Sequence, residues 1–429
     1  MPRFLCVFVA ALNGFLFGYQ TAVIAGAMLF IKQEFQLSAA AQGVAVSMIL
    51  LGALAASLAA GTWADRFGRK SVFWAAGLLF VIGTWIASEA MTANFFLAGR
   101  FLTGAGIGLT SVVTPMYLGE IAPVRYRGTF ISFYQLAITI GILAAYGINL
   151  IYAEAGDWRW MLVWGAFPAL IQMVCLPFLC ESPDWLIGKG FSEKARAAAQ
   201  KIGSPLEVSD HPLIEQKGWK SLAAPKLRLA LFVGLALSCF QQVTGINAVI
   251  YYAPQVFELV GFPSAESAIF ATLGMGVINV LATSIAVVLL DRLGRKALLI
   301  AGLAGMALAL GGIAGAFLFH WRAADVIAAV ALTAYVVFFA IGLGPVTWVI
   351  IAEIYPVNLR GKAVSLAILL NWLCNYFVTL TFLILVKGLG AGGTFVLFGL
   401  SSLAGLFFVC RFIPETKGKT HEEIERLFL

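Results

Sequence analysis

The sequence is poor in charge and nearly free of histidine. Lys, Arg, Asp and Glu make up 11% of its 429 residues and only three residues are His, whereas 61% are hydrophobic and the mean hydropathy is +0.94. A soluble domain of this length needs a charged surface, so this composition excludes a soluble domain. The sequence also lacks a phosphate-binding loop, a metal-ligand cluster and a nucleophile–base pair, so it indicates no enzyme and no metal or other cofactor.

The six cysteines show no spacing typical of a metal site or a disulfide framework. Each lies within an apolar run or at its end. We therefore interpret them as small apolar packing residues. They are Cys6, Cys175, Cys180, Cys239, Cys374 and Cys410.

Long apolar runs fill most of the chain, and short charged segments separate them. Because about 20 apolar residues span a bilayer, the runs predict an all-α membrane protein with about twelve transmembrane helices. The expected spans are 4–30, 42–63, 72–91, 94–118, 128–150, 159–180, 227–260, 265–290, 297–319, 324–352, 361–387 and 391–413.

The basic residues are distributed unevenly between the two sides of these spans. All but five of the 28 Lys and Arg residues fall in the N-terminus, the even-numbered connections and the tail. This asymmetry predicts that both termini are cytoplasmic. The net charge of +7 then reflects topology, not nucleic-acid binding. We expect a monomeric multi-pass protein of the inner (plasma) membrane, and its short loops favour a bacterial one. The five exceptions are Lys32, Arg100, Arg159, Arg322 and Lys387.

A charged phrase occurs twice, once in each half of the chain. The segment 65–70 returns as 291–296, and Glu120-Ile-Ala-Pro is matched by Glu353-Ile-Tyr-Pro. A repeat at so long a spacing predicts two fused, similar halves with a functional site between them, the construction of many transporters. We expect six-helix bundles at 1–180 and 227–413, a cytoplasmic linker with short helices at 181–226 and a tail at 414–429. In the linker we expect a helix from Glu193 to Ile202 with Ser192 as its N-cap.

Acidic and basic residues gather at the cytoplasmic ends of the expected spans in both halves. Gly68 and Gly294 permit tight turns there. We hypothesise that ion pairs among these residues form when the cytoplasmic side closes and stabilise the outward-open state. The alternative is charge that only sets topology. The residues of this expected gate are Asp65, Arg66, Arg69, Lys70, Glu120, Arg127, Glu181, Asp291, Arg292, Arg295, Glu353, Arg360 and Glu415.

Neutral polar side chains gather inside a few of the spans. Gln241, Gln242 and Asn247 surround Gly245, which permits a break in the helix, and Asn371 begins a polar stripe on the eleventh span. Amides bind hydroxyl groups well, and such side chains are costly in a membrane unless paired. The cluster therefore indicates a sugar site, and the alternative is hydrogen bonding between helices.

Together these motifs resemble the sugar porter family of the major facilitator superfamily. The resemblance rests on the two Asp-Arg-x-Gly-Arg-Lys loops, Pro115-x-Tyr117-x-x-Glu120, Glu181-Ser182-Pro183, Gln241-Gln242-x-x-Gly245-Ile246-Asn247 and Pro414-Glu415-Thr416, and it covers essentially the whole chain. It implies alternating-access transport of a monosaccharide, with a hexose such as glucose expected. For the linker at 181–226, one hypothesis is that its helix latches the two halves together in one state, and the alternative is a solvated linker. Asp184 and Cys180 stand where the family has an arginine and a proline, which argues against the latch on the N-terminal half.

The resemblance also implies which residues bind the sugar. Seven positions match the family's sugar-binding residues, and three aromatic residues lie close to them in the sequence pattern. They are Gln135, Gln241, Gln242, Asn247, Asn279, Trp348 and Asn371, with Phe17, Tyr251 and Trp372 beside them.

The sequence predicts no titratable residue deep within the spans. Proton-coupled relatives typically read Gly-Tyr-Asp in the first span, whereas this chain reads Gly18-Tyr19-Gln20, and glutamine does not titrate. Arg100 is expected to face Gln20, and its alternative is a structural role of bonding to main-chain carbonyls. We therefore expect a uniporter.

Other functions stay open. A proton-coupled symporter is the first alternative, with Gln20 as an introduced substitution or with coupling through another group. A non-transporting sugar sensor is the second, although sensors carry long extensions and only a short segment follows Pro414. The sequence does not separate hexose from pentose or inositol.

Overall fold

The computed structural model describes residues 2–122, 127–203, 221–222, 224–319, 323–355, 359–417, 419, 423–424 and 427. Within these ranges the chain forms helices and no strand, which confirms the all-α prediction. It divides into two compact units, Met1–Asp210 (unit 1) and His211–Leu429 (unit 2).

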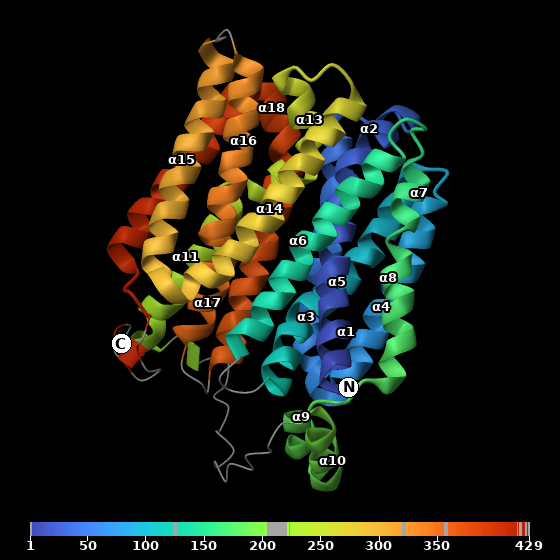
Figure 1. The fold of residues 1–429 in the computed structure, drawn as a ribbon, viewed down its shortest axis with the longest axis vertical. Coiled ribbons are helices and arrows are strands. Elements are labelled where there is room, and N and C mark those ends of the chain that lie inside the picture. Colours follow the sequence, from blue (N-terminus) through green and yellow to red (C-terminus); the bar gives the residue numbers. More distant parts are fainter. Residues whose placement is uncertain are drawn as a thin grey trace. The chain divides into compact units, whose positions relative to one another are not determined.

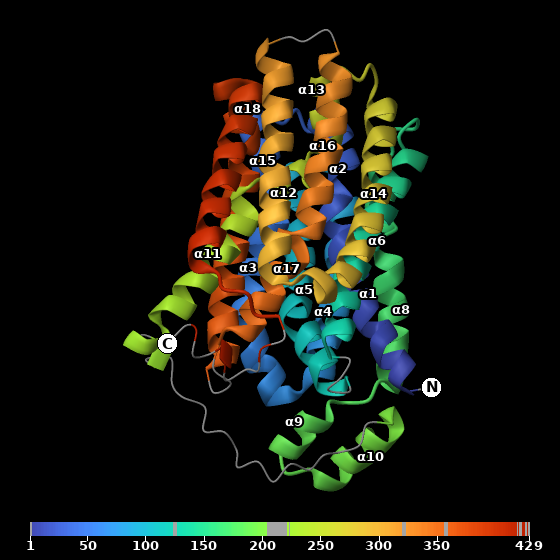
Figure 2. The ribbon, with the colours of Figure 1, turned by 60° about the vertical axis from the view of Figure 1, so that its left-hand side comes forward.

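Unit 1 is a bundle of long helices. In it α3 and α4 both pack on α5, and α1 packs on α6. The short helices α9 and α10 lie beyond the end of this bundle at which α1 begins (Figures 1 and 2). The helices are α1 (Pro2–Ala22), α2 (Ile24–Glu34), α3 (Ala39–Phe67), α4 (Arg69–Ser88), α5 (Ala93–Ile121), α6 (Arg127–Ile151), α7 (Trp158–Val163), α8 (Ala166–Cys175), α9 (Pro183–Gly188) and α10 (Ser192–Ile202).

Glycines bring α3 and α5 into close contact. A Cβ added at Gly104 or Gly108 of α5 would overlap the main-chain oxygen of Ile49 or Ala53 on α3, and a Cβ at Gly52 of α3 would overlap a main-chain oxygen of α5. Small residues at helix interfaces are typical of membrane bundles, since they let backbones approach each other. This packing accounts for part of the high glycine content, 44 residues.

Unit 2 is a second helical bundle. In it α15 packs on α16 and α18, and α11 also packs on α18. Within α18, Gly390 has non-helical angles (φ 72°, ψ 166°), so two helices meet there at a kink. The helices are α11 (Arg228–Val243), α12 (Ile246–Tyr251), α13 (Ala253–Val260), α14 (Ala265–Leu293), α15 (Arg295–Phe319), α16 (Ala324–Ile341), α17 (Leu343–Glu353) and α18 (Arg360–Phe412).

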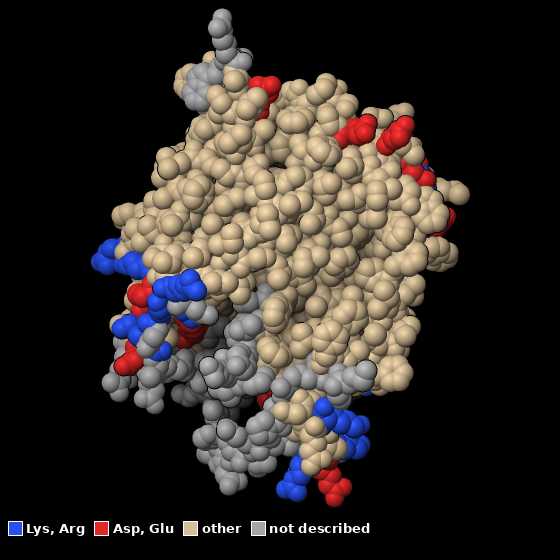
Figure 3. Space-filling view, in the orientation of Figure 1, with Lys and Arg blue, Asp and Glu red and all other residues tan. Residues whose placement is uncertain are grey.

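Eleven helical runs of the described residues are long and apolar enough to cross a bilayer. The last of them, Gly361–Phe412, has 52 residues and includes the kink at Gly390. Large apolar side chains point outward, such as Leu308 (79% exposed) and Phe407 (71%). Charged side chains on the face in Figure 3 lie toward the helix ends. The chain is a multi-pass membrane protein, while the count of twelve helices and the cytoplasmic termini stay predictions.

The expected seventh span, 227–260, is divided into three helices. Gly245 has a φ of 92° and separates α11 from α12, and Tyr252 separates α12 from α13. A left-handed φ is readily adopted by glycine and costs other residues free energy. The break expected at Gly245 is therefore confirmed.

The segment between the bundles is described only in part. Residues 204–220 lie outside the described ranges, so the expected domain boundaries and the latching role of the linker stay predictions. The expected helix is present as α10, but Phe191 occupies its N-cap position and makes no side-chain capping bond. The assignment of Ser192 as N-cap was wrong by one residue, because Ser192 already has helical geometry.

Candidate functional site

Four amide side chains of unit 2 form one connected hydrogen-bond cluster, here called the amide cluster (Gln241, Gln242, Asn247 and Asn371). Gln242 Nε2 donates to Asn371 Oδ1 at 3.1 Å, and Asn371 Nδ2 donates to Gln241 Oε1 at 2.7 Å. Asn247 Nδ2 donates to Gln242 Oε1 at 2.7 Å. The cluster thus joins the end of α11, the start of α12 and the first half of α18.

Main-chain carbonyls hold the cluster in place from two sides. Gln241 Nε2 donates to the carbonyl of Leu343 at the start of α17 (3.1 Å). Asn371 Nδ2 also donates to the carbonyl of Ser238 on α11 (3.0 Å). Gln241 and Asn371 are 3% and 5% exposed, so their side chains are positioned by bonds and by packing.

The break in the seventh span creates this arrangement. Without a regular helix after Val243, the carbonyl of Thr244 lacks its usual partner within the helix, and the Tyr335 hydroxyl of α16 donates to it at 2.8 Å. A Cβ on Gly245 would overlap the ring of Phe398 on α18. Glycine is therefore required at this position by both its φ and the close packing.

The other predicted sugar-binding residues lie on several helices. Tyr251, Trp372 and Asn279 are buried on α12, α18 and α14, and Trp348 is half-buried on α17. In unit 1, Gln135 on α6 and Phe17 on α1 are half-buried. Hydrogen bonds join the four amides into one cluster, and a sugar-binding role for all ten residues stays a proposal.

The polar stripe expected on the eleventh span is also bonded within unit 2. Thr379 Oγ1 donates to Asn375 Oδ1 at 3.2 Å, and the Tyr252 hydroxyl donates to the Thr379 carbonyl at 3.2 Å. Sequence reasoning missed Tyr335, although a lone tyrosine in an apolar run was a usable signal.

In unit 1, Gln20 and Arg100 come together through the main chain. Arg100 Nη1 donates to the carbonyl of Gln20 at 2.7 Å, while Gln20 Nε2 donates to Thr84 Oγ1 on α4 at 2.9 Å. Both residues are buried, at 2% and 1% exposure respectively. The predicted proximity is present, but it uses the backbone carbonyl, and this agrees with the alternative given for Arg100.

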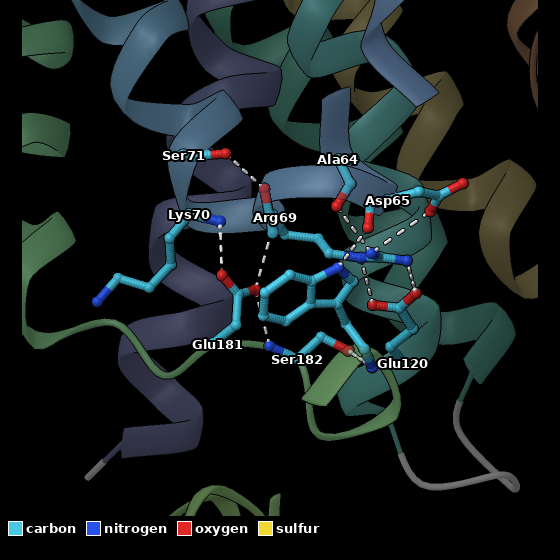
Figure 4. A network of polar contacts seen from close by, with 10 residues as sticks. Ala64, Asp65, Arg69, Lys70, Ser71, Glu120, Glu181 and Ser182 are labelled. Atoms are coloured by element: carbon cyan, nitrogen blue, oxygen red, sulfur yellow. Dashed lines mark hydrogen bonds and ion pairs between the residues drawn. The ribbon is translucent and has the colours of Figure 1, made fainter. Parts of the chain in front are cut away.

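The charged residues of unit 1 form a network at the turn between α3 and α4 (Figure 4). Arg69 donates to both carboxylate oxygens of Glu120, at 2.7 and 3.0 Å, and lies 3.5 Å from Asp65. The carboxylate of Glu181 accepts the main-chain N–H groups of Arg69 (3.0 Å) and Lys70 (3.2 Å). A carboxylate in this position caps the N-terminus of α4 and complements its dipole.

The same network recurs in unit 2. Arg295 Nη2 donates to Glu353 at 3.0 Å, and the carboxylate of Glu415 accepts the main-chain N–H groups of Arg295 and Lys296 at 2.9 and 3.0 Å. Thr416 Oγ1 adds a bond to Glu353 at 2.7 Å. Partial burial opposes ionisation of Glu415, but main-chain donors outweigh it and lower the pKa of this carboxyl.

Glycine turns connect the helices in both networks. Gly68 and Gly294 have φ values of 91° and 90°, which confirms the tight turns expected from the sequence. A lysine of each turn also donates to a main-chain carbonyl more than 100 residues away: Lys70 to Pro177 at 3.5 Å and Lys296 to Cys410 at 3.2 Å. The repeat is therefore structural as well as sequential.

Some gate residues take other roles or cannot be placed. The guanidinium of Arg66 lies over the ring of Phe67, and the carbonyl of Arg292 accepts from Lys417 Nζ at 2.6 Å. The side chains of Arg127, Asp291 and Arg360 lie outside the described part of the structure.

Comparisons with known proteins identify the class. The family model described as "Sugar (and other) transporter" matches residues 6–428. The putative metabolite transport protein YwtG of Bacillus subtilis is 39% identical over 98% of this chain and 93% of its own. The galactose-proton symporter of Escherichia coli is 36% identical over 99% of this chain and 94% of its own.

Solved structures give the same result. The proton:xylose symporter XylE, of the major facilitator superfamily, bound to 6-bromo-6-deoxy-D-glucose matches with a TM-score of 0.82 and 32% identity, over 100% of this chain and 99% of that chain. The protein is a multi-pass membrane transporter and not an enzyme. It belongs to the sugar transporter family, in the sugar porter branch that the motifs indicated, and it is an inner-membrane protein of bacterial type.

The comparisons do not support the uniport prediction. The relatives whose names state a transport mode, such as the galactose-proton symporter and XylE, are proton symporters. They favour the alternative of proton-coupled sugar transport. The uniport prediction relied on the lack of a titratable residue deep within the spans, including position 20, whereas the similarity to these symporters extends along the whole chain.

Proposed function

We propose that this protein is a proton-coupled monosaccharide transporter whose sugar site centres on the amide cluster of unit 2. The observation that carries the proposal is the bonded set of amides, three buried and one half-buried, at a break in the seventh span. An amide presents both donors and an acceptor, so it suits a sugar hydroxyl, which also does both. Relatives whose names state a sugar include transporters of xylose, glucose, galactose and arabinose, which supports a monosaccharide.

The other expected residues complete this proposed site. Within unit 2, Asn279 and Trp348 supply further polar groups, and Tyr251 and Trp372 supply aromatic surface for the apolar face of the sugar ring. Gln135 and Phe17 of unit 1 stay predicted sugar-binding residues. The hydrogen bonds within the amide cluster hold the side chains ready in the absence of sugar. Sugar binding then exchanges some amide–amide bonds for amide–hydroxyl bonds, so these side chains lose little conformational freedom on binding.

The two charge networks provide the proposed gate. Each joins the ends of helices that are far apart in the sequence, through an Arg–Glu pair and a carboxylate at a helix N-terminus. We expect these bonds to be made when the cytoplasmic side is closed and to open with it, so that each unit has two discrete arrangements. The sugar binds one arrangement more tightly than the other, and this difference shifts the equilibrium between them.

Proton coupling in this chain requires a titratable group other than residue 20. Gln20 cannot take up a proton, and its amide is bonded to Thr84. We propose Glu120 for this role, because its side chain is only 17% exposed and Arg69 is its ion-pair partner. Protonation would neutralise Glu120, weaken the pair and so link proton binding to opening of the gate.

Uptake into liposomes tests the function and its mode. Purified protein is reconstituted, and the uptake of radiolabelled glucose and xylose is measured with and without an inward proton gradient. We expect one of these sugars to accumulate above its outside concentration when the gradient is imposed. Uptake that only reaches equilibrium and ignores the gradient would establish uniport and exclude the symport proposal, while no uptake of either sugar would contradict the substrate class.

A further inference from the structure

Two cysteines of unit 2 meet between α11 and α18, although 135 residues separate them in the sequence. The sulfur atoms of Cys239 and Cys374 lie 3.7 Å apart. Both side chains are half-buried, so neither is sealed in the core. This contact is one the sequence did not indicate, since the cysteines were expected to serve only as apolar packing.

The pair lies directly beside the amide cluster. Cys239 follows Ser238, whose carbonyl accepts from Asn371, and it precedes Gln241 by two residues. Cys374 lies about one helical turn beyond Asn371 on α18. A covalent bond between the sulfurs would therefore fasten the two helices at the level of the proposed sugar site.

We propose that Cys239 and Cys374 form a thiol–disulfide site through which hydroperoxides arrest transport. A disulfide needs a sulfur–sulfur distance of about 2.05 Å, so the two sulfurs must approach by less than the width of one atom. The two thiols lie on helices that already pack against each other. Bringing the sulfurs together therefore requires adjustment of side chains and a slight shift of the helices.

The oxidation balances with hydrogen peroxide as the oxidant. The sulfur of one cysteine attacks the O–O bond, which breaks to give a sulfenic acid and one water that carries away the thiol proton. The second thiol then attacks the sulfenic sulfur: the S–S bond forms, the S–O bond breaks, and hydroxide leaves with the second thiol proton as water. Two thiols are oxidised by two electrons and one peroxide is reduced to two waters.

The effect on transport rests on the proposed sugar site. A disulfide would hold Gln241 and Asn371 at one spacing, whereas alternating access requires the helices around a site to rearrange. Oxidised protein should then lose uptake, and reduction by a dithiol should restore it.

The experiment separates disulfide formation from its effect on transport. A variant with alanine at the other four cysteines, Cys6, Cys175, Cys180 and Cys410, is reconstituted in liposomes and treated with hydrogen peroxide. Maleimide labelling after denaturation, read by mass spectrometry, counts the remaining thiols. The matched control carries Cys374→Ala in addition, which leaves Cys239 without its partner.

The expected result is the loss of both labelled thiols on oxidation, a several-fold fall in sugar uptake, and recovery of both after reduction. In the Cys374→Ala control, peroxide should not cause a fall in uptake that reduction reverses. Two thiols that stay labelled after peroxide treatment, or a disulfide that forms without lowering uptake, would overturn the proposal. A failure of the sugar proposal is distinct, because uptake would then be absent before any oxidant is added.

Discussion

Arg69 binds Glu120 through two hydrogen bonds at the turn between α3 and α4 (Figure 4), and in unit 2 Arg295 binds the corresponding Glu353 through one. The carboxylates Glu181 and Glu415 complete both networks by capping α4 and α15. The two units thus make the same kind of contact at corresponding positions. The repeated phrase in the sequence therefore encodes a repeated structural junction, and charge that only sets topology would not produce these bonds.

The geometry of the Arg69–Glu120 pair predicts that lysine cannot replace the arginine. Arg69→Lys keeps the charge but loses the planar fork that reaches both oxygens, so we expect the protein to lose on the order of 1–2 kcal/mol of stability and most of its transport. Thermal unfolding and liposome uptake measure the two effects. Arg66→Lys is the matched control, since Arg66 lies over Phe67 and not in this pair. Equal behaviour of the two variants would show that the pair has no special role.

The proposed proton site predicts a separation of two transport activities. Glu120→Gln removes the titratable group and keeps an amide that can still bond Arg69, so accumulation driven by a proton gradient should be lost. Exchange of labelled for unlabelled sugar at equal concentrations should continue, because it needs no net proton movement. Gln20→Leu is the control and should retain accumulation. Unchanged accumulation by Glu120→Gln would remove Glu120 from the coupling mechanism.

The pKa of Glu415 predicts a loss of stability in acid. Its folded-state pKa is lowered, so its contribution to stability is complete above the ordinary value of 4.5 and disappears as the pH falls through the lower folded-state pKa. Unfolding temperatures in detergent, compared between pH 7 and pH 3, should therefore differ less for Glu415→Gln than for the natural protein. Glu193→Gln is the control, because Glu193 is an exposed residue of α10. An identical pH dependence in Glu415→Gln and the natural protein would contradict this assignment.

The left-handed turn at Gly245 predicts a localised structural requirement. Gly245→Ala places a Cβ where φ is 92° and where the Phe398 ring lies, so we expect a cost of about 1–3 kcal/mol and impaired transport. Gly274→Ala on α14 is the matched control, because nothing lies within 4 Å of its added Cβ. Thermal unfolding compares the variants. A Gly245→Ala protein as stable as Gly274→Ala would show that the break tolerates a side chain.

Local chemistry explains what the sequence predicted well. The turns at Gly68 and Gly294 and the break at Gly245 depend on backbone angles that glycine adopts with little cost, so residue type alone indicated them. The hydrogen bond between Asn371 and Gln241 agrees with the alternative of bonding between helices, because amides left unpaired in a membrane are costly. Apolar runs of sufficient length predicted the helices, because main-chain polar groups are also costly to leave unpaired in a membrane.

Packing over long distances explains what the sequence did not predict. The carbonyls of Leu343 and Ser238, which hold the amide cluster, are present in every residue type and leave no mark in a sequence. The contact of Cys239 with Cys374 depends on how α11 meets α18. Gln20 was expected to face Arg100, but its amide turns to Thr84, a choice that depends on the neighbouring helix.

The most direct test of the account is the affinity of purified protein for sugar when one amide of the cluster is removed. Gln241→Ala is compared with Gln172→Ala, because both glutamines are buried and donate Nε2 to a main-chain carbonyl of another helix, at 3.1 and 3.2 Å. Binding of radiolabelled glucose and xylose should weaken about 10- to 100-fold in Gln241→Ala, which corresponds to about 1.4–2.8 kcal/mol, and should be little changed in Gln172→Ala. Equal affinities in the two folded variants would contradict a sugar site at the amide cluster.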